Sequence, residues 1–477
     1  MNMFVFNHKK GLSVLVSSLL TLCMLFTSCG DFLDIKPYGR TVPKTTEEYQ
    51  ALVTEMLTAI DGTNTGETGA GALFFNNEMV RSFETYGDNM ETSLTSPSSN
   101  MAYYVGNLLG TNEASVYYER FYRVISRCNI ILDNYETGRD TENGQQLIGA
   151  CYALRGLAYY QLLRMYCEPV GAAAKPLGVP IVTGFDMEAK PNRSSYEETF
   201  KQVESDFKTA MSKNIKNDVY LFTPEIVKGL LARLYFWTGH FAEAKQYADQ
   251  LIAAHPLLSG EDYKKMEEAV DGLAGNMLLR CDRSPVSGHA FSYLNPYFME
   301  RPLCARFVKL FAEKDKDIRY TLYFNKRRLN NKRFFSGLRT AEFYLISMES
   351  AYHLGDRTEA LRMLNEFRAH RISPYTAYTM GTLPPVDADE NIKVDCTGTA
   401  LTPLMQAILN ERRKELYLEG DRFFELKRNG RPEFWATSNG LKYTTEKFMY
   451  TFPLPPADLQ VNPGLVQNPG YTEVLYN

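Results

Sequence analysis

The chain has 477 residues, with 52 Lys and Arg against 56 Asp and Glu, and a formal net charge of −4. Its hydrophobic fraction of 44% is too high for a disordered chain and too low for a polytopic membrane protein. A slightly acidic chain without a long basic run also argues against nucleic acid as a partner. Aromatic residues are abundant, with 31 Tyr and 28 Phe but 2 Trp, so any stacking surface must be built largely from tyrosine.

The first 28 residues have the pattern of a secretory signal peptide. Lys9 and Lys10 precede an apolar stretch at 11–26, which is too short and wrongly flanked for a membrane-spanning helix. The four residues that end at Cys29 resemble a bacterial lipobox, although Phe26 stands where leucine is usual. We therefore expect cleavage before Cys29 and its lipidation, which anchors the protein in a membrane. An ordinary signal peptide with an incidental cysteine is the alternative.

Helical periodicity dominates the rest of the chain. Apolar residues recur on one face over 117–136 and again over 144–167, which predicts two long helices. A third helix is expected over 194–213, where Ser194 and Ser195 precede two glutamates and either serine can cap the helix.

The clearest repeat lies at 226–256. Ala232 and Ala244 allow two antiparallel helices to approach closely, Gly239 makes the turn between them, and Pro256 ends the second helix. This spacing fits a tetratricopeptide repeat, a helix–turn–helix unit of 34 residues.

Two later segments, 343–371 and 404–428, repeat this arrangement with turn glycines at Gly355 and Gly420. Such helix pairs must stack on one another to bury their apolar faces, so we expect a helical repeat array. Unrelated helical hairpins are the alternative for these two later segments. Between the repeats lie three long insertions, 60–112, 257–335 and 372–400, and loops of this length are usually functional.

No catalytic, nucleotide-binding or zinc motif is present. The cysteines outside the leader never form a C-x-x-C pair and the histidines are scattered, so neither a metal nor a cofactor is predicted. The acidic stretch 387–391 has some spacing of a calcium loop but lacks the turn glycine and the closing glutamate. We expect a solvated loop there, with calcium as the alternative.

Charges over 411–428 are expected to form structural ion pairs. Trp237 is expected in the core, and Trp435 is expected to serve packing.

Several segments together resemble the SusD/RagB family of nutrient-binding lipoproteins. They occur in the family's order and span nearly the whole chain after Cys29: Cys29–Asp34, Leu177–Val182, Arg339–Ile346, Asn410–Leu416 with Glu419–Arg422 and Leu426–Arg428, and Phe452–Tyr471. The resemblance implies a mainly α-helical fold, in which four tetratricopeptide-like repeats carry an irregular, loop-rich ligand-binding region. We divide the chain into a leader at 1–28, an N-terminal region at 29–220 and a C-terminal region at 221–477.

The resemblance also implies a function. Such proteins lie on the outer face of the outer membrane, where they cover a TonB-dependent SusC-like transporter and capture oligosaccharides, or in RagB-like members peptides, for import. No catalysis and no cofactor is implied. From other classes, a surface glycosidase would need a carboxylate pair across a cleft, and a purely structural repeat scaffold would not show the resemblance along the whole chain.

Glycan capture needs aromatic rings beside fixed polar groups. Two turn-rich stretches combine these residue types, and their predicted ligand-binding residues are Tyr86, Asp88, Asn89, Tyr103 and Tyr104 in the first, and Tyr293, Asn295 and Tyr297 in the second. Packing of these rings onto the helices is the alternative.

Overall fold

The computed structural model describes residues 43–62, 68–91, 105–106, 113–172, 174–184, 186, 188–216, 219–270, 272–281, 301–438 and 441–471. From Thr46 onward these residues belong to one compact unit. The predicted leader and the predicted lipidation of Cys29 lie outside the described residues, and the division at residue 220 stays a prediction.

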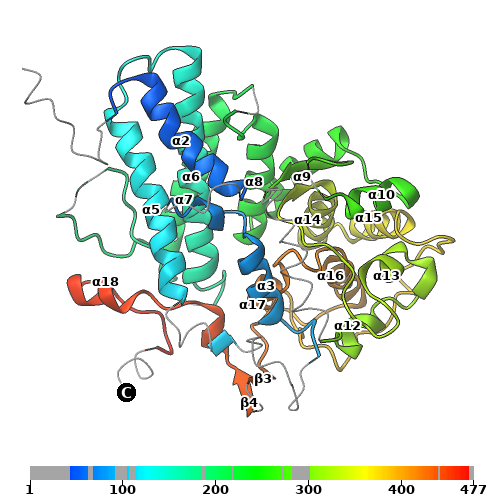
Figure 1. The fold of residues 1–477 in the computed structure, drawn as a ribbon. Coiled ribbons are helices and arrows are strands. Elements are labelled where there is room, and N and C mark those ends of the chain that lie inside the picture. Colours follow the sequence, from blue (N-terminus) through cyan, green and yellow to red (C-terminus); the bar gives the residue numbers. More distant parts are fainter. Residues whose placement is uncertain are drawn as a thin grey trace, which may run out of the picture. The chain divides into compact units, whose positions relative to one another are not determined.

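The unit is mainly helical, as the sequence predicted (Figure 1). Its α-helices are α2 (Thr46–Ile60), α3 (Asn77–Thr85), α5 (Glu113–Asn134), α6 (Glu142–Tyr166), α7 (Tyr196–Ser212), α8 (Pro224–Trp237), α9 (Phe241–Ala254), α10 (Gly260–Glu268), α12 (Ala305–Lys309), α13 (Ile318–Tyr323), α14 (Thr340–His353), α15 (Arg357–Ala369), α16 (Pro403–Glu415), α17 (Arg422–Arg428) and α18 (Pro456–Val461). Short 3-10 turns are η2 (Ala70–Ala72), η4 (Lys314–Lys316) and η5 (Lys447–Tyr450). No helix of the described part is long and apolar enough to cross a membrane.

The predicted repeats correspond to helical hairpins. Segment 226–256 forms α8 and α9, 343–371 forms α14 and α15, and 404–428 forms α16 and α17. All three turn glycines have positive φ angles, 79° at Gly239, 88° at Gly355 and 72° at Gly420, a region that L-residues with a side chain rarely enter. The hairpins pack on one another through contacts of α14 with both α9 and α16.

Capping side chains and prolines determine where several helices begin. Ser195 caps α7 with a full capping box, since its hydroxyl accepts from the Glu198 amide and the Glu198 side chain accepts from the Ser195 amide. Thr223 caps α8 in front of Pro224, and Thr402 caps α16 in front of Pro403. These caps explain why the predicted helix boundaries agree with the structure to within a few residues.

Strands are few and short. β1 (Met277–Arg280) pairs antiparallel with β2 (Gly337–Arg339), with Leu279 opposite Leu338 and a bulge beside it. β3 (Phe434–Ser438) and β4 (Leu441–Thr445) form a second antiparallel pair in which Phe434 lies opposite Thr445. Both pairs connect helical segments rather than form a layer of their own.

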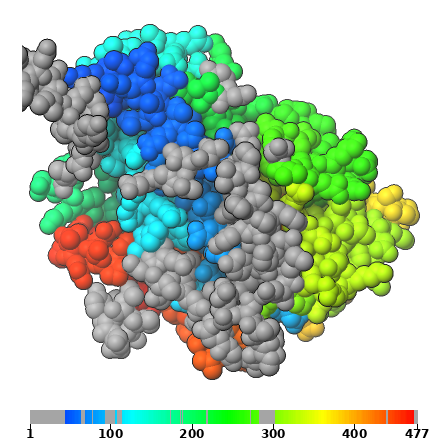
Figure 2. All heavy atoms as spheres, in the orientation of Figure 1, coloured from blue at the N-terminus to red at the C-terminus, as the bar shows by residue number. Residues whose placement is uncertain are grey.

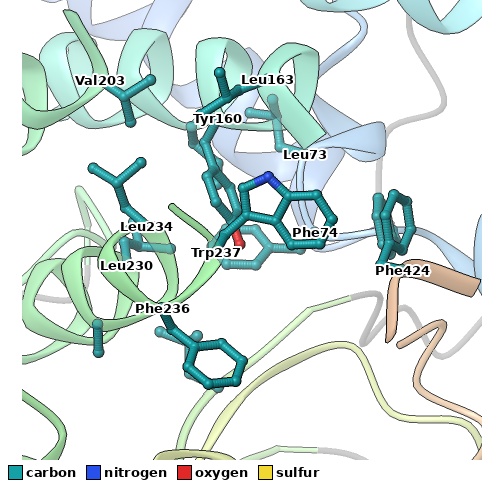
Figure 3. Packing of buried hydrophobic residues seen from close by; sticks show 14 of the residues in the cluster. Leu73, Phe74, Tyr160, Leu163, Val203, Leu230, Leu234, Phe236, Trp237 and Phe424 are labelled. Carbon is teal, nitrogen blue, oxygen red and sulfur yellow. The ribbon is translucent and has the colours of Figure 1, made fainter. Parts of the chain in front are cut away.

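The two tryptophans differ in their surroundings. Trp237 is buried, and its indole meets the Phe424 ring at 6.1 Å between centroids, beside Tyr160 and Phe74 (Figure 3). The prediction of a core role for Trp237 is therefore confirmed. Trp435, for which packing was predicted, is 45% exposed on β3, and the Lys442 amine lies 4.9 Å from its ring centre.

Buried ion pairs hold the C-terminal half together, as predicted for 411–428. The carboxylate of Glu415, fully buried on α16, accepts from Arg339 at 2.7 Å, from Arg371 at 2.9 Å and from Arg319 at 3.2 Å. These arginines come from β2, the end of α15 and α13, so one carboxylate joins three segments that are distant in sequence. Arg371 and Arg339 overcome the effect of burial and hold the pKa of Glu415 well below its ordinary value.

Replacing Glu415 tests this arrangement. Glu415→Gln removes the carboxylate that pairs with Arg371 and one of those that pair with Arg319 and Arg339, and we expect the free energy of unfolding to fall by about 3–5 kcal/mol in urea denaturation. The matched control is Glu197→Gln, which removes an exposed pair with Lys201 and should not change stability measurably. Equal stability of the two variants would contradict the structural role of Glu415.

Candidate functional site

The described end of the first stretch, at Met90 and Glu91, contacts residues that follow the second stretch in the chain. Met90 forms an isolated antiparallel bridge with Leu303, and the Glu91 amide donates to the Pro302 carbonyl at 2.9 Å. Glu91, the last described residue of the first stretch, therefore lies beside Pro302. Residues far apart in the chain are brought together at this place.

Three predicted ligand residues are described, and all are buried. Tyr86, Asp88 and Asn89 have exposed fractions of 4%, 5% and 0%. The Tyr86 ring packs edge-on against Phe423 at 6.5 Å between centroids. Because their side chains are turned into the protein, these three residues serve the fold, and the prediction that they contact ligand has to be corrected. The other predicted residues, Tyr103, Tyr104, Tyr293, Asn295 and Tyr297, lie outside the described residues.

Asp88 is the centre of a buried ion-pair cluster. Its carboxylate accepts from Arg422 at 2.6 and 3.0 Å, from Arg413 at 3.1 Å and from the Asn391 amide at 2.8 Å. Burial by itself would raise the pKa of Asp88, but the two guanidinium groups hold it well below its ordinary value. With its oxygens engaged in this way, Asp88 fixes the root of the first stretch onto α16 and α17.

Asn89 connects the same cluster to α3. Its side-chain oxygen accepts from Arg413 at 2.7 Å, and its amide donates to Glu84 at 2.6 Å. The carboxylate of Glu84 is fully enclosed, and burial raises its pKa to about 7. The turn after α3 is thus held from both sides by charged groups.

The acidic stretch 387–391 belongs partly to this cluster. Glu390 is buried and pairs with Arg413 at 2.8 Å and with Arg422 at 3.2 Å, while Asp387 pairs with Lys309 at 3.0 Å. The expectation of a solvated loop is therefore wrong at Glu390, although Ala388 and Asp389 are exposed. Because lysine and arginine side chains pair with the carboxylates of both Glu390 and Asp387, the calcium alternative has no support here.

Next to this stretch lies a cleft of about 1130 Å³ between α12, α16 and the segment 375–388. It combines the half-buried ring of Tyr378 with polar side chains, among them Gln406 and Asn410. The Tyr378 hydroxyl accepts from Arg368 at 3.0 Å, and the guanidinium lies 4.6 Å from the ring centre, which fixes the ring. Tyr378 is not among the predicted ligand residues, although it lies in the long insertion 372–400.

A second depression has a different character. It runs between α5 and α18 and is lined mainly by Tyr118, Tyr122, Pro456 and Val461. Figure 2 shows α18 in red on the same face as the cyan segment that contains α5. Its lining is mostly apolar, although charged side chains such as Glu119, Arg123 and Asp458 also take part in it.

A third cleft, of about 1050 Å³, lies beside Trp237 and contains an unusual amine. Lys427 lines it but is buried, and its amine donates to the carbonyl of Arg164 at 2.6 Å and to that of Met165 at 3.3 Å. Burial lowers the pKa of Lys427 to about 7.

Comparison with known proteins gives this geometry its context. One family model, described as starch-binding and associating with the outer membrane, matches residues 31–236, and a model of the SusD family matches residues 316–471. The chain belongs to the SusD/RagB family. This family consists of non-catalytic binding proteins, and the chain is accordingly not an enzyme.

Individual relatives agree with this assignment. A SusD-like protein of Formosa agariphila is 24% identical over 446 residues, which cover 76% of this chain and 81% of the relative. A crystal structure of a SusD superfamily protein from Bacteroides thetaiotaomicron superposes with a TM-score of 0.69 at 21% identity and covers 89% of this chain and all of that one. A structure titled putative sugar binding protein, from Bacteroides vulgatus, has a TM-score of 0.66 at 21% identity and covers 91% of this chain and all of that one. The predicted SusD-like fold is thereby confirmed.

The buried position of Lys427 predicts that the free energy of unfolding depends on pH. The folded pKa lies near 7 and the unfolded value near 10.4, so the unfolded chain binds more protons between these pH values and stability rises with pH across this window. In Lys427→Met this contribution is absent. The difference in unfolding free energy, wild type minus variant, should rise from pH 7 to pH 9 in urea titrations, and a difference that is constant or falls would contradict the buried amine.

Proposed function

We propose that this chain is a cell-surface lipoprotein that binds oligosaccharides or polysaccharides without cleaving them and delivers them to a SusC-like TonB-dependent transporter of the outer membrane. The observation that carries this proposal is the pair of family models, of which the N-terminal one is described as starch-binding and associating with the outer membrane. Two structural neighbours from Bacteroides vulgatus support it, since their titles name sugar binding and carbohydrate binding.

The described contacts support a glycan surface beside Glu91 and Pro302. A backbone hydrogen bond joins Glu91 to Pro302, and the ion pairs of Asp88 hold the turn that follows α3 in place. Loops that start from a rigid base can present aromatic rings at fixed spacing, which lowers the entropic cost of binding. We therefore keep Tyr103, Tyr104, Tyr293, Asn295 and Tyr297 as the proposed ligand contacts.

The cleft at Tyr378 is a proposed extension of this surface. A sugar ring can stack its C–H face on an aromatic ring while its hydroxyls pair with amides, and this cleft offers both groups. It adjoins the acidic stretch whose Asn391 donates to Asp88, so it lies next to the Asp88 cluster. An extended polysaccharide could contact both places at once.

The membrane anchor and the transporter complete the proposal. Lipidation of Cys29 would hold the protein at the outer membrane, and more than one acyl chain gives stable anchoring. The transporter partner is proposed from the family, and a direct test is co-purification of the detergent-solubilised chain with a SusC-like protein.

Affinity electrophoresis of the full-length chain in detergent tests the function. We expect at least one polysaccharide in a broad panel to retard the protein, while size-exclusion chromatography of that polysaccharide shows no shortening. Tyr297→Ala and Tyr378→Ala should each weaken binding about tenfold, because a lost stacking contact costs about 1–1.5 kcal/mol. Tyr247→Ala, which removes a half-buried ring on the repeat helix α9, is the matched control and should bind normally.

Other outcomes would overturn the proposal in distinct ways. Shortening of the polysaccharide would indicate a glycosidase. Binding of peptides but of no glycan in the panel would indicate the RagB-like alternative. Normal glycan binding in both tyrosine variants would place the ligand surface elsewhere.

A further inference from the structure

Three potential metal ligands converge beside α14. Glu349 and His353 are four residues apart on this helix and therefore lie on one face. Cys396 approaches from a loop that is distant in sequence. The His353 Nε2 atom lies 3.4 Å from the Cys396 Sγ and 3.6 Å from the Glu349 Oε1, and one ligand atom of each residue lies within 4.8 Å of the others.

We propose that Glu349, His353 and Cys396 form a binding site for a zinc-like divalent metal ion. Typical zinc bonds of about 2.0–2.3 Å in a tetrahedron imply separations of roughly 3.3–3.6 Å between ligand atoms. The two separations measured from the His353 nitrogen agree with this spacing. One thiolate, one imidazole and one carboxylate favour zinc over calcium or magnesium, which prefer oxygen ligands alone.

The arrangement differs from a catalytic relay. In a Cys–His–carboxylate relay, the thiol and the carboxylate bind opposite nitrogens of the imidazole. Here both approach the same atom, Nε2 of His353. Three potential ligand atoms that lie within 4.8 Å of one another are close enough to bind one ion.

The Glu349 carboxylate carries an independent sign of a missing partner. The residue has no exposed surface, and its Oε2 atom is buried without a hydrogen-bond partner. Its Oε1 atom, which lies 3.6 Å from His353 Nε2, also accepts from Arg428 at 2.5 Å, so Oε2 is the acceptor left for an ion. A metal ion would satisfy the remaining acceptor of a group that is otherwise costly to bury.

The other two ligands are held in place by their surroundings. The His353 ring stacks on Phe241, with 4.4 Å between centroids and 18° between planes. Cys396 lies in a tight turn in which one Asp395 carboxylate oxygen accepts from the Thr397 and Thr399 amides at 2.9 and 3.1 Å. The site therefore needs little rearrangement to bind an ion, which would link this turn to the end of α14.

A path to the site exists. The cleft beside Trp237 is lined by Phe241, Cys396, Thr397 and Gly398, so an ion can reach the thiol from solvent. The same opening leaves room for water as a fourth ligand, the arrangement found in three-ligand zinc sites.

Titration of the metal-free full-length chain with Co²⁺ tests the wild-type site directly. We expect a thiolate-to-cobalt charge-transfer band in the near-ultraviolet, together with visible bands of tetrahedral intensity, that saturate at one equivalent. Zn²⁺ should displace the cobalt and abolish these bands. A saturated wild-type chain without a thiolate charge-transfer band would overturn the proposal, whatever the variants show.

Variants then assign the ligands. Cys396→Ser should remove the charge-transfer band, and His353→Gln should weaken Zn²⁺ binding at least tenfold in equilibrium dialysis. His255→Gln changes a histidine that pairs with Glu225 at the surface and should keep full binding. Circular dichroism checks that each variant is folded, and an unchanged cobalt spectrum in folded Cys396→Ser would overturn the proposal by placing the metal elsewhere.

Discussion

The structure depends on carboxylates that have been removed from water and surrounded by arginines. Glu415 is the clearest case, with three guanidinium partners from three separate segments. Removing such charges from water costs several kcal/mol per ion, and the cost is recovered only when hydrogen-bond geometry is good on all sides. The network therefore contributes specificity: segments that approach in any other arrangement leave a buried charge unpaired.

Helix α16 links this network to the candidate site. Glu415 faces the arginines of β2 and α13, whereas Arg413, two residues earlier, faces Asp88, Asn89 and Glu390. One helix thus fixes both the packing of the last repeats and the root from which the first aromatic stretch emerges. A binding protein that performs no chemistry needs this kind of base, because its affinity depends on the spacing of contacts on otherwise unsupported loops.

Sequence reasoning succeeded where structure is local. The spacing of apolar residues, the capping serine and threonines, and the turn glycines specify helices and hairpins from within a few residues, and these predictions were confirmed. It failed at Tyr86, Asp88 and Asn89, because a turn-rich segment with polar residues resembles an exposed loop. Asp88 is buried by its partners Arg413 and Arg422, which lie more than three hundred residues away in the chain. A single sequence gives no indication of that contact. The exposure of Trp435 and the convergence of Cys396 on α14 were missed for the same reason.

The proposed glycan surface lies beside Glu91 and Pro302, next to the Asp88 cluster. Hydrogen exchange of the full-length chain, followed by mass spectrometry with and without a polysaccharide that it binds, tests this most directly. The account predicts ligand-dependent protection in peptides that cover 86–106 and 282–304, and unchanged exchange in α16. Protection confined to the groove between α5 and α18, with none in those two segments, would contradict it.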